Sequence, residues 1–250
     1  NKILKANPYT LSMLKFITDK NSNIYFALLH SIISCEDPPL ITTDVSTHLS
    51  RMKNDPLIAG CWDEVQQALN AMNRGDYHAS LRTLLPTIER VLREISIKEG
   101  VAGTDKGLRA LVEIVKGHKF VSERVESLIK ALGRDTELHG LETLDHNRAK
   151  VYAELALMAL LELIRDYRRH KILHRALKEI SKDISMSFEE LIKAYPKNRR
   201  ITHVQFLSDR SMRITIKSKH VFEVSQGSDE KIKIKRLIND TLRSCSQSRA

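Results

Sequence analysis

The spacing of the apolar residues changes along this chain of 250 residues, after Tyr195 and Pro196. Before that point the apolar residues recur every three or four positions, which is the period of an amphipathic helix. After it they alternate with polar residues, which is typical of strands that bury one face. The chain is therefore predicted to be mainly α-helical, an antiparallel helical bundle followed by a small C-terminal antiparallel β meander.

The predicted bundle occupies residues 56–195. Gly75 can end one helix in the left-handed conformation, and Asp76 can cap the next, which has a wide apolar face. Pro86 lies inside that second helix, so a kink or a loosened turn is expected there. The longest and most apolar helical stretch covers residues 151–172.

Residues 1–55 are expected to form a separate N-terminal helical segment and linker. Asn7 and Pro8 can open the first of two short helices. Residues 36–55 are rich in Pro, Thr, Ser and Asp, a composition that predicts an extended linker with room for one helical turn.

Residues 196–250 are predicted to be a basic, β-rich C-terminal appendage. Its strands are marked by three groups of apolar residues, with Ser208–Ser211 and then Ser218 and Lys219 as the turns between them. A further alternation of lysines and isoleucines over 231–235 is compatible with a fourth strand or with the start of a final helix. The three apolar groups are Val204 and Phe206, then Met212, Ile214 and Ile216, then Val221 and Val224.

Cysteine usage and hydropathy exclude several classes of protein. Cys35, Cys61 and Cys245 are odd in number and far apart, so they predict neither a disulfide framework nor a zinc site, and a reducing, cytoplasmic setting is expected. The most apolar stretch is shorter than a membrane span and contains Glu154 and Glu162, so no membrane association is expected. The sequence shows no signal peptide, and its start at Asn1 is compatible with a larger parent protein.

The positive charge is concentrated in the last third of the chain. The net charge is +10, and from Arg165 onward about 21 Lys and Arg stand against about 10 Asp and Glu. This asymmetry favours a polyanionic partner, nucleic acid before a membrane surface. The basic helix that begins near Arg165 is predicted to contact the phosphates of a nucleic acid. The alternative is that its basic face is only exposed to solvent. Its candidate residues are Arg165, Arg168, Arg169, Lys171 and Arg175.

The octapeptide Gly133–Gly140 is the main candidate for chemistry. It contains Arg134, Asp135 and His139. On a helix, Asp135 and His139 lie one turn apart, so the carboxylate can hydrogen-bond the imidazole and fix its tautomer. Arg134 lies about 140° around the helix from His139, so one copy does not focus both side chains on one point. Two copies that face each other across a twofold axis could do so.

These residue types suit cleavage of a phosphodiester without a metal or another cofactor. A histidine can move the proton of a ribose 2′-hydroxyl or of the leaving oxygen, and a guanidinium can hold the phosphate as charge builds on it. The spacing alone is a weak signal, because it recurs as Arg165 with His170 and as Arg169 with His174. Gly140 and the neighbouring helical stretches distinguish the first copy.

Three stretches resemble the HEPN superfamily (higher eukaryotes and prokaryotes nucleotide-binding). They are Tyr77–Arg93, the run Arg134–Gly140 and the alanine-rich Tyr152–Leu161. Members of this family carry an arginine, a polar residue and a following histidine at the mouth of a helical bundle. The likeness covers roughly residues 62–175.

The resemblance implies a metal-independent endoribonuclease that dimerises to build a composite active site. Such proteins are often toxins or antiviral defence effectors that degrade RNA, with an antitoxin or a sensor as a further partner. By this likeness Arg134 and His139 would be catalytic and Asp135 would be the orienting polar residue. The family more often has asparagine at that position, and aspartate would raise the basicity of His139.

The alternative interpretation is that the bundle is catalytically inactive. The bundle could be a HEPN-like dimerisation or adaptor module of a larger protein that binds nucleic acid or a protein partner. His139 would then be a helix-terminal histidine hydrogen-bonded to Asp135, and Arg134 would pair with Glu137 or Glu142. The two readings differ in whether two Arg134 and His139 pairs face each other across a basic cleft.

Overall fold

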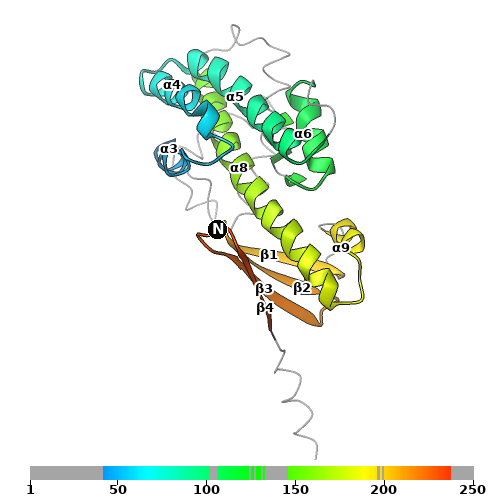
Figure 1. Cartoon of the computed structure of the whole chain (residues 1–250). Helices are drawn as coiled ribbons and strands as arrows, with labels where there is room; N and C mark the ends of the chain where they lie inside the picture. The colour runs from blue at the N-terminus through cyan, green and yellow to red at the C-terminus, as the bar shows by residue number, and fades with distance from the viewer. Residues whose placement is uncertain are drawn as a thin grey trace, which may run out of the picture. The chain divides into compact units, whose positions relative to one another are not determined.

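The computed structural model describes residues 42–101, 106–123, 125–126, 128–130, 132, 146–195, 198 and 200–237. Within these residues the protein is mainly helical, with a four-stranded antiparallel sheet near its C-terminal end, as predicted (Figure 1). The chain divides into two compact units, Asn1–Asp166 and Tyr167–Ala250. The helix α8 (His146–Asp183) begins in the first unit and ends in the second. Each unit has its own apolar core.

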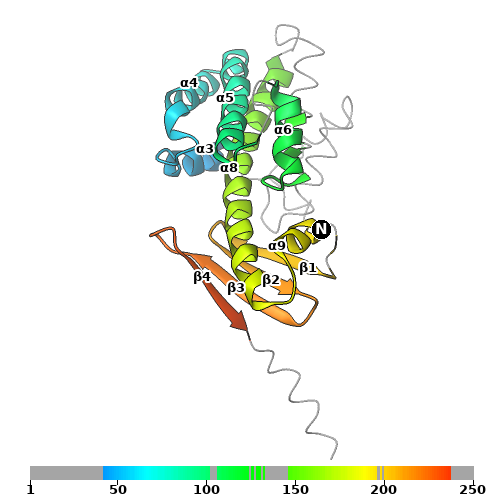
Figure 2. The ribbon, with the colours of Figure 1, turned by 45° about the vertical axis from the view of Figure 1, so that its right-hand side comes forward.

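The first unit is a bundle of helices around the first part of α8 (Figure 2). Its other elements are α3 (Thr42–Arg51), the 3₁₀ helix η2 (Ala59–Cys61), α4 (Trp62–Asn73), α5 (Tyr77–Lys98) and α6 (Leu108–Gly117). Between Ala153 and Ile164, nearly every side chain of α8 is buried, on all sides of the helix. A helix that is apolar on all sides is stable in water at the centre of such a core. The predicted bundle is thus confirmed at the level of helices around a central helix.

The junction between α4 and α5 is formed as predicted. Gly75 has φ +79°, the left-handed conformation that ends α4. The Asp76 carboxylate accepts a hydrogen bond from the backbone N–H of Ala79 at 3.0 Å and so caps α5. The helix continues through Pro86 to Lys98 without a break.

Removing this cap is expected to destabilise the first unit. The Asp76→Ala substitution should lower the free energy of unfolding by about 1 kcal/mol, because the N–H of Ala79 loses its acceptor. Asp76→Asn keeps an acceptor oxygen at the same position and should cost much less. Urea denaturation of both variants measures the difference, and equal losses would show that the cap is not the cause.

One expectation about local structure differs from what is observed. Residues 42–51 form the helix α3 rather than an extended linker, because Val45 and Leu49, one turn apart, are both buried in the core. The division between the compact units falls inside α8, after Asp166. The second part of α8 belongs with the sheet because its apolar side chains are buried there.

The second unit is a sheet with helices packed on one face. The helix α9 (Phe188–Ala194) begins with a capping box in which Ser187 and Glu190 exchange hydrogen bonds. The strands are β1 (Thr202–Ser208), β2 (Ser211–Ile216), β3 (His220–Gln226) and β4 (Ile232–Leu237), in the order β1-β2-β3-β4. Ile232–Leu237 is therefore a fourth strand and not the start of a final helix. Phe222 lies in the core of this unit, whereas the predicted Val221 lies on the opposite face.

Candidate nucleic-acid interface

The predicted catalytic residues Arg134, Asp135 and His139 lie outside the described residues. The nearest described residues are Leu132, which is helical and buried, and His146, which is exposed at the start of α8. The His146 ring packs edge-on against Tyr77 with the ring centroids 5.1 Å apart. The start of α8 and the start of α5 are thus neighbours. Tyr77 begins the first of the three stretches compared with the family, and His146 lies between the other two.

The predicted phosphate-binding helix is the part of α8 that continues into the second unit. Its apolar side is formed by Ile172, Leu173 and Leu177, which are buried in the core with the sheet residues. The opposite side is basic. Five cations on it follow one another at spacings of three and four residues, and we call them the basic stripe: Arg168, Lys171, Arg175, Lys178 and Lys182.

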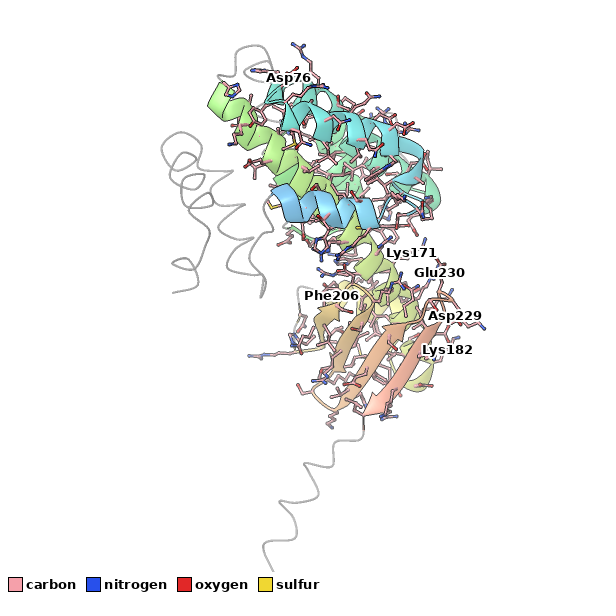
Figure 3. All side chains as sticks on the ribbon, turned by 90° about the vertical axis from the view of Figure 1, so that its left-hand side faces the viewer. Asp76, Lys171, Lys182, Phe206, Asp229 and Glu230 are labelled. Atoms are coloured by element: carbon pink, nitrogen blue, oxygen red, sulfur yellow. The ribbon has the colours of Figure 1, made fainter. Side chains whose placement is uncertain are left out.

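The geometry of a helix brings the side chains of the basic stripe together. At 100° per residue the five positions fall within an arc of about 80°, and from first to last they extend about 21 Å along the axis. Arg175, Lys178 and Lys182 are exposed, and Arg168 and Lys171 are half-buried. Figure 3 labels Lys171 and Lys182, which lie on this part of α8. The stripe is long enough to follow several successive phosphates of a nucleic acid.

Neighbouring groups neutralise this charge in part. Lys182 forms an ion pair with Glu179 at 2.6 Å, near one end of the stripe. Lys171 donates a hydrogen bond to the Tyr167 hydroxyl at 3.1 Å and lies 5.4 Å from the centroid of that ring. Glu179 offsets the charge of Lys182, whereas the contacts with the neutral Tyr167 leave the charge of Lys171 in place. The stripe therefore keeps a strong positive field at its exposed centre, at Arg175 and Lys178.

Two of the predicted contact residues lie elsewhere. Arg169 forms an ion pair with Asp209 at 2.7 Å and lies 5.8 Å from the centroid of the Phe206 ring, so it packs between α8 and the sheet. Arg165 belongs to the first unit, where it pairs with Glu162 at 3.4 Å. Both side chains are mostly covered. Lys178 and Lys182 complete the stripe instead, and counting positions around the helix from Arg168 identifies both in the sequence.

The other two Arg and His pairs of the same spacing are packing positions. His170 is buried, with its ring between the rings of Tyr195 and Phe206 at centroid distances of 5.7 and 5.9 Å. The His174 ring packs edge-on against Phe188. These histidines help to hold α8 against α9 and β1, so their spacing from an arginine carries no catalytic implication.

Other kinds of site are not apparent in the part of the chain that the structure describes. No group of three or more His, Cys, Asp or Glu residues there could hold a metal ion. Nor is any helix in that part long and apolar enough to span a membrane. Cys61 is buried, and burial raises the pKa of its thiol.

The buried thiol of Cys61 is expected to resist alkylation. Its raised pKa lowers the fraction of reactive thiolate at neutral pH, and burial blocks the reagent. Iodoacetamide should therefore modify Cys61 much more slowly in the folded protein than in urea, as followed by mass spectrometry of its peptide. Equal rates would show that this part of the first unit opens readily.

Comparisons of the chain with protein-family models, with curated proteins and with solved structures found no match.

Proposed function

We propose that this protein is a metal-independent endoribonuclease of the HEPN type, with a composite active site at a homodimer interface. Arg134 and His139 carry the catalysis and Asp135 orients the histidine. A toxin or an antiviral defence effector is the biological role that fits such an activity. The proposal is supported by the residue types of the octapeptide, by the helical unit that contains its flanks, and by the basic stripe.

The basic stripe is the observation that carries the RNA-binding part of the proposal, because it gives the protein a surface suited to RNA. Its five cations lie on one side of one helix, and Lys182 at one end pairs with Glu179. Lys and Arg at this spacing bind phosphates and release counterions, whatever the base sequence. An effector that degrades many RNAs needs this kind of binding.

The chemistry assigned to the octapeptide is a transfer within the RNA chain. His139 removes the proton of a 2′-hydroxyl, and the 2′-oxygen attacks the adjacent phosphorus. The bond from phosphorus to the 5′-oxygen breaks, and that oxygen takes up a proton. The products carry a 2′,3′-cyclic phosphate and a 5′-hydroxyl. Arg134 stabilises the negative charge on the phosphate oxygens, and the second protomer supplies the other half of the site.

A second candidate is a catalytically inactive HEPN-like dimerisation or adaptor module. It is favoured by the position of the basic stripe in the second compact unit, whereas residues 133–140 fall in the sequence range of the first. Binding of nucleic acid by one unit does not require chemistry in the other. An adaptor of this kind would bind nucleic acid or a protein partner; if it binds RNA through the stripe, it differs from the first candidate in whether the RNA is cut.

Dependence on protein concentration tests the composite site. With EDTA present, the rate of RNA cleavage per protein chain should rise with concentration and level off once the dimer is formed. Sedimentation measured over the same range should give the same midpoint. A rate per chain that stays constant while the protein changes from monomer to dimer would contradict a site built from two protomers.

A further inference from the structure

The two edge strands of the sheet differ in charge. Among the described residues, β1 and β4 each have a neighbouring strand on one side. β4 carries Lys233, Lys235 and Arg236, and charged side chains of this kind keep an edge strand from pairing with another chain. β1 has the sequence THVQFLS, without a lysine, arginine, aspartate or glutamate. The β1 edge lacks the protection that the β4 edge has.

The hydrogen bonds of the sheet show which backbone groups of β1 face outward. The N–H of Lys217 donates to the carbonyl of Ile201 at 2.9 Å, so the odd-numbered residues of β1 are those bonded to β2. In an antiparallel pair the alternate residues point their N–H and C=O groups away from the partner. The N–H of Thr202 donates to Asn198 at 3.0 Å. Within the described part of the chain, the outward N–H groups that remain are those of Val204 and Phe206, and the carbonyl of Thr202 also faces outward.

The side chains beside these groups suit an additional strand. Val204 and Phe206 are partly buried against the core of the unit, so an apolar side chain on a new strand would extend that core. Figure 3 shows Phe206 on β1. On the opposite face Leu207 is 50 % exposed, although it is a large apolar residue. The ladder is irregular after Phe206, which limits regular pairing to residues 202–206.

The charges around β1 select an acidic occupant. Arg200 and Arg210 are exposed on either side of the strand, and the second unit as a whole carries a large excess of Lys and Arg. A second copy of the same unit would bring two strongly positive bodies together, which is unfavourable. An extended segment that carries carboxylates would be attracted.

We propose that β1 binds an extended acidic peptide segment of a partner protein, which adds to the sheet as a fifth strand. The backbone groups of Val204 and Phe206 would supply the hydrogen bonds, and contact with the side chains of these two residues would favour apolar residues at every second position of the peptide. This surface is independent of the octapeptide and of RNA cleavage, so the proposal does not depend on the proposed function.

A proline on each edge strand gives a matched test. In Val204→Pro the lost N–H is one that faces outward, so the bonds to β2 remain. Ile234→Pro is the equivalent change on β4: the N–H of Gly227 donates to Lys231, so the odd residues bond to β3 and Ile234 faces outward. Both side chains are partly buried apolar residues on the same face.

The probe is a fluorescein-labelled peptide of about eight residues in which Val and Glu alternate. Its anisotropy is expected to report binding to the wild-type protein, binding weakened at least about tenfold by Val204→Pro, and binding unchanged in Ile234→Pro. A peptide with Lys in place of Glu should not bind. Equal weakening by the two prolines, or weakening by Ile234→Pro alone, would overturn the proposal.

Amide hydrogen exchange of the wild-type protein keeps the test valid if a proline variant does not fold. The amides of Val204 and Phe206 should exchange rapidly in the free protein and become protected when the Val and Glu peptide is added. Protection already present without peptide would mean that the β1 edge is covered. Protection by single-stranded RNA but not by the peptide would mean that the edge binds RNA and not a peptide. Either result would overturn the proposal, as would a lack of protection under any condition.

Discussion

Replacing His139 with alanine is expected to lower the rate of RNA cleavage by a factor of about 10² to 10⁴ or more, with little change in RNA affinity. The magnitude is that of losing general acid–base catalysis of proton transfer. RNA binding should persist because the proposed contacts are those of the basic stripe and not of the histidine. The measurement is a single-turnover rate on a labelled RNA in EDTA, with binding followed separately by anisotropy.

A matched control comes from the same chain. His174→Ala removes another histidine that follows an arginine by five positions, Arg169, but this ring packs against Phe188. Its cleavage rate should stay close to that of the wild-type protein once circular dichroism confirms the fold. Arg134→Lys keeps the positive charge and loses the planar fork of the guanidinium, so an intermediate loss is expected. Equal losses in His139→Ala and His174→Ala would remove His139 from the chemistry.

Neutralising the basic stripe is expected to weaken RNA binding on the order of a hundredfold at about 0.1 M salt. The variant is the triple substitution of Arg168, Arg175 and Lys178 with glutamine. For single strands each lost phosphate contact lowers the slope of log K against log salt by about 0.7, so the triple variant should lose about 2 units of slope. RNA affinity measured at several salt concentrations gives both quantities.

A second triple variant separates the stripe from net charge. Lys193, Lys217 and Lys219 are exposed cations of the same unit that lie outside the stripe. Their replacement with glutamine removes the same number of charges. Its salt slope should stay close to that of the wild-type protein. Similar slopes in the two triple variants would mean that RNA responds to the overall field of the unit and that α8 makes no specific phosphate contacts.

Local signals predicted the parts of the fold that depend on neighbouring residues. Gly75 and Asp76 mark the junction of α4 and α5 because left-handed φ and side-chain capping each depend on one residue. The meander was predicted from the alternation of apolar and polar residues, and Met212, Ile214 and Ile216 are all buried in the core. For these elements sequence and structure agree in type and nearly in bounds.

The sequence does not show which core each part of α8 packs against or which side each of its arginines faces. The apolar pattern of α8 continues from Ala153 to Ile180, although the core that it contributes to changes from helices to a sheet. No change of period marks the division after Asp166, so the spacing of apolar residues alone does not locate it. Arg168 and Arg169 look alike in the sequence, but a turn of 100° places the second one toward Asp209.

The candidate active site was predicted from residue types and a family resemblance, and it lies outside the described residues. The candidate RNA-binding surface was predicted as a set of cations on one helix. The structure describes that helix and shows which cations share its outer side. Arg168, Lys171 and Arg175 were predicted and belong to the basic stripe. Arg165 and Arg169 were also predicted, but their side chains form ion pairs away from the stripe.

The most direct test of the ribonuclease proposal is the incubation of total RNA with wild-type protein and with His139→Ala, in EDTA, at matched concentrations of folded protein. We expect the wild-type protein to cut the RNA into fragments that end in 2′,3′-cyclic phosphates, and the variant to leave it intact. If both proteins leave the RNA intact, or both cut it equally, the proposed catalytic role of His139 is contradicted. The adaptor reading would then be favoured in the first case.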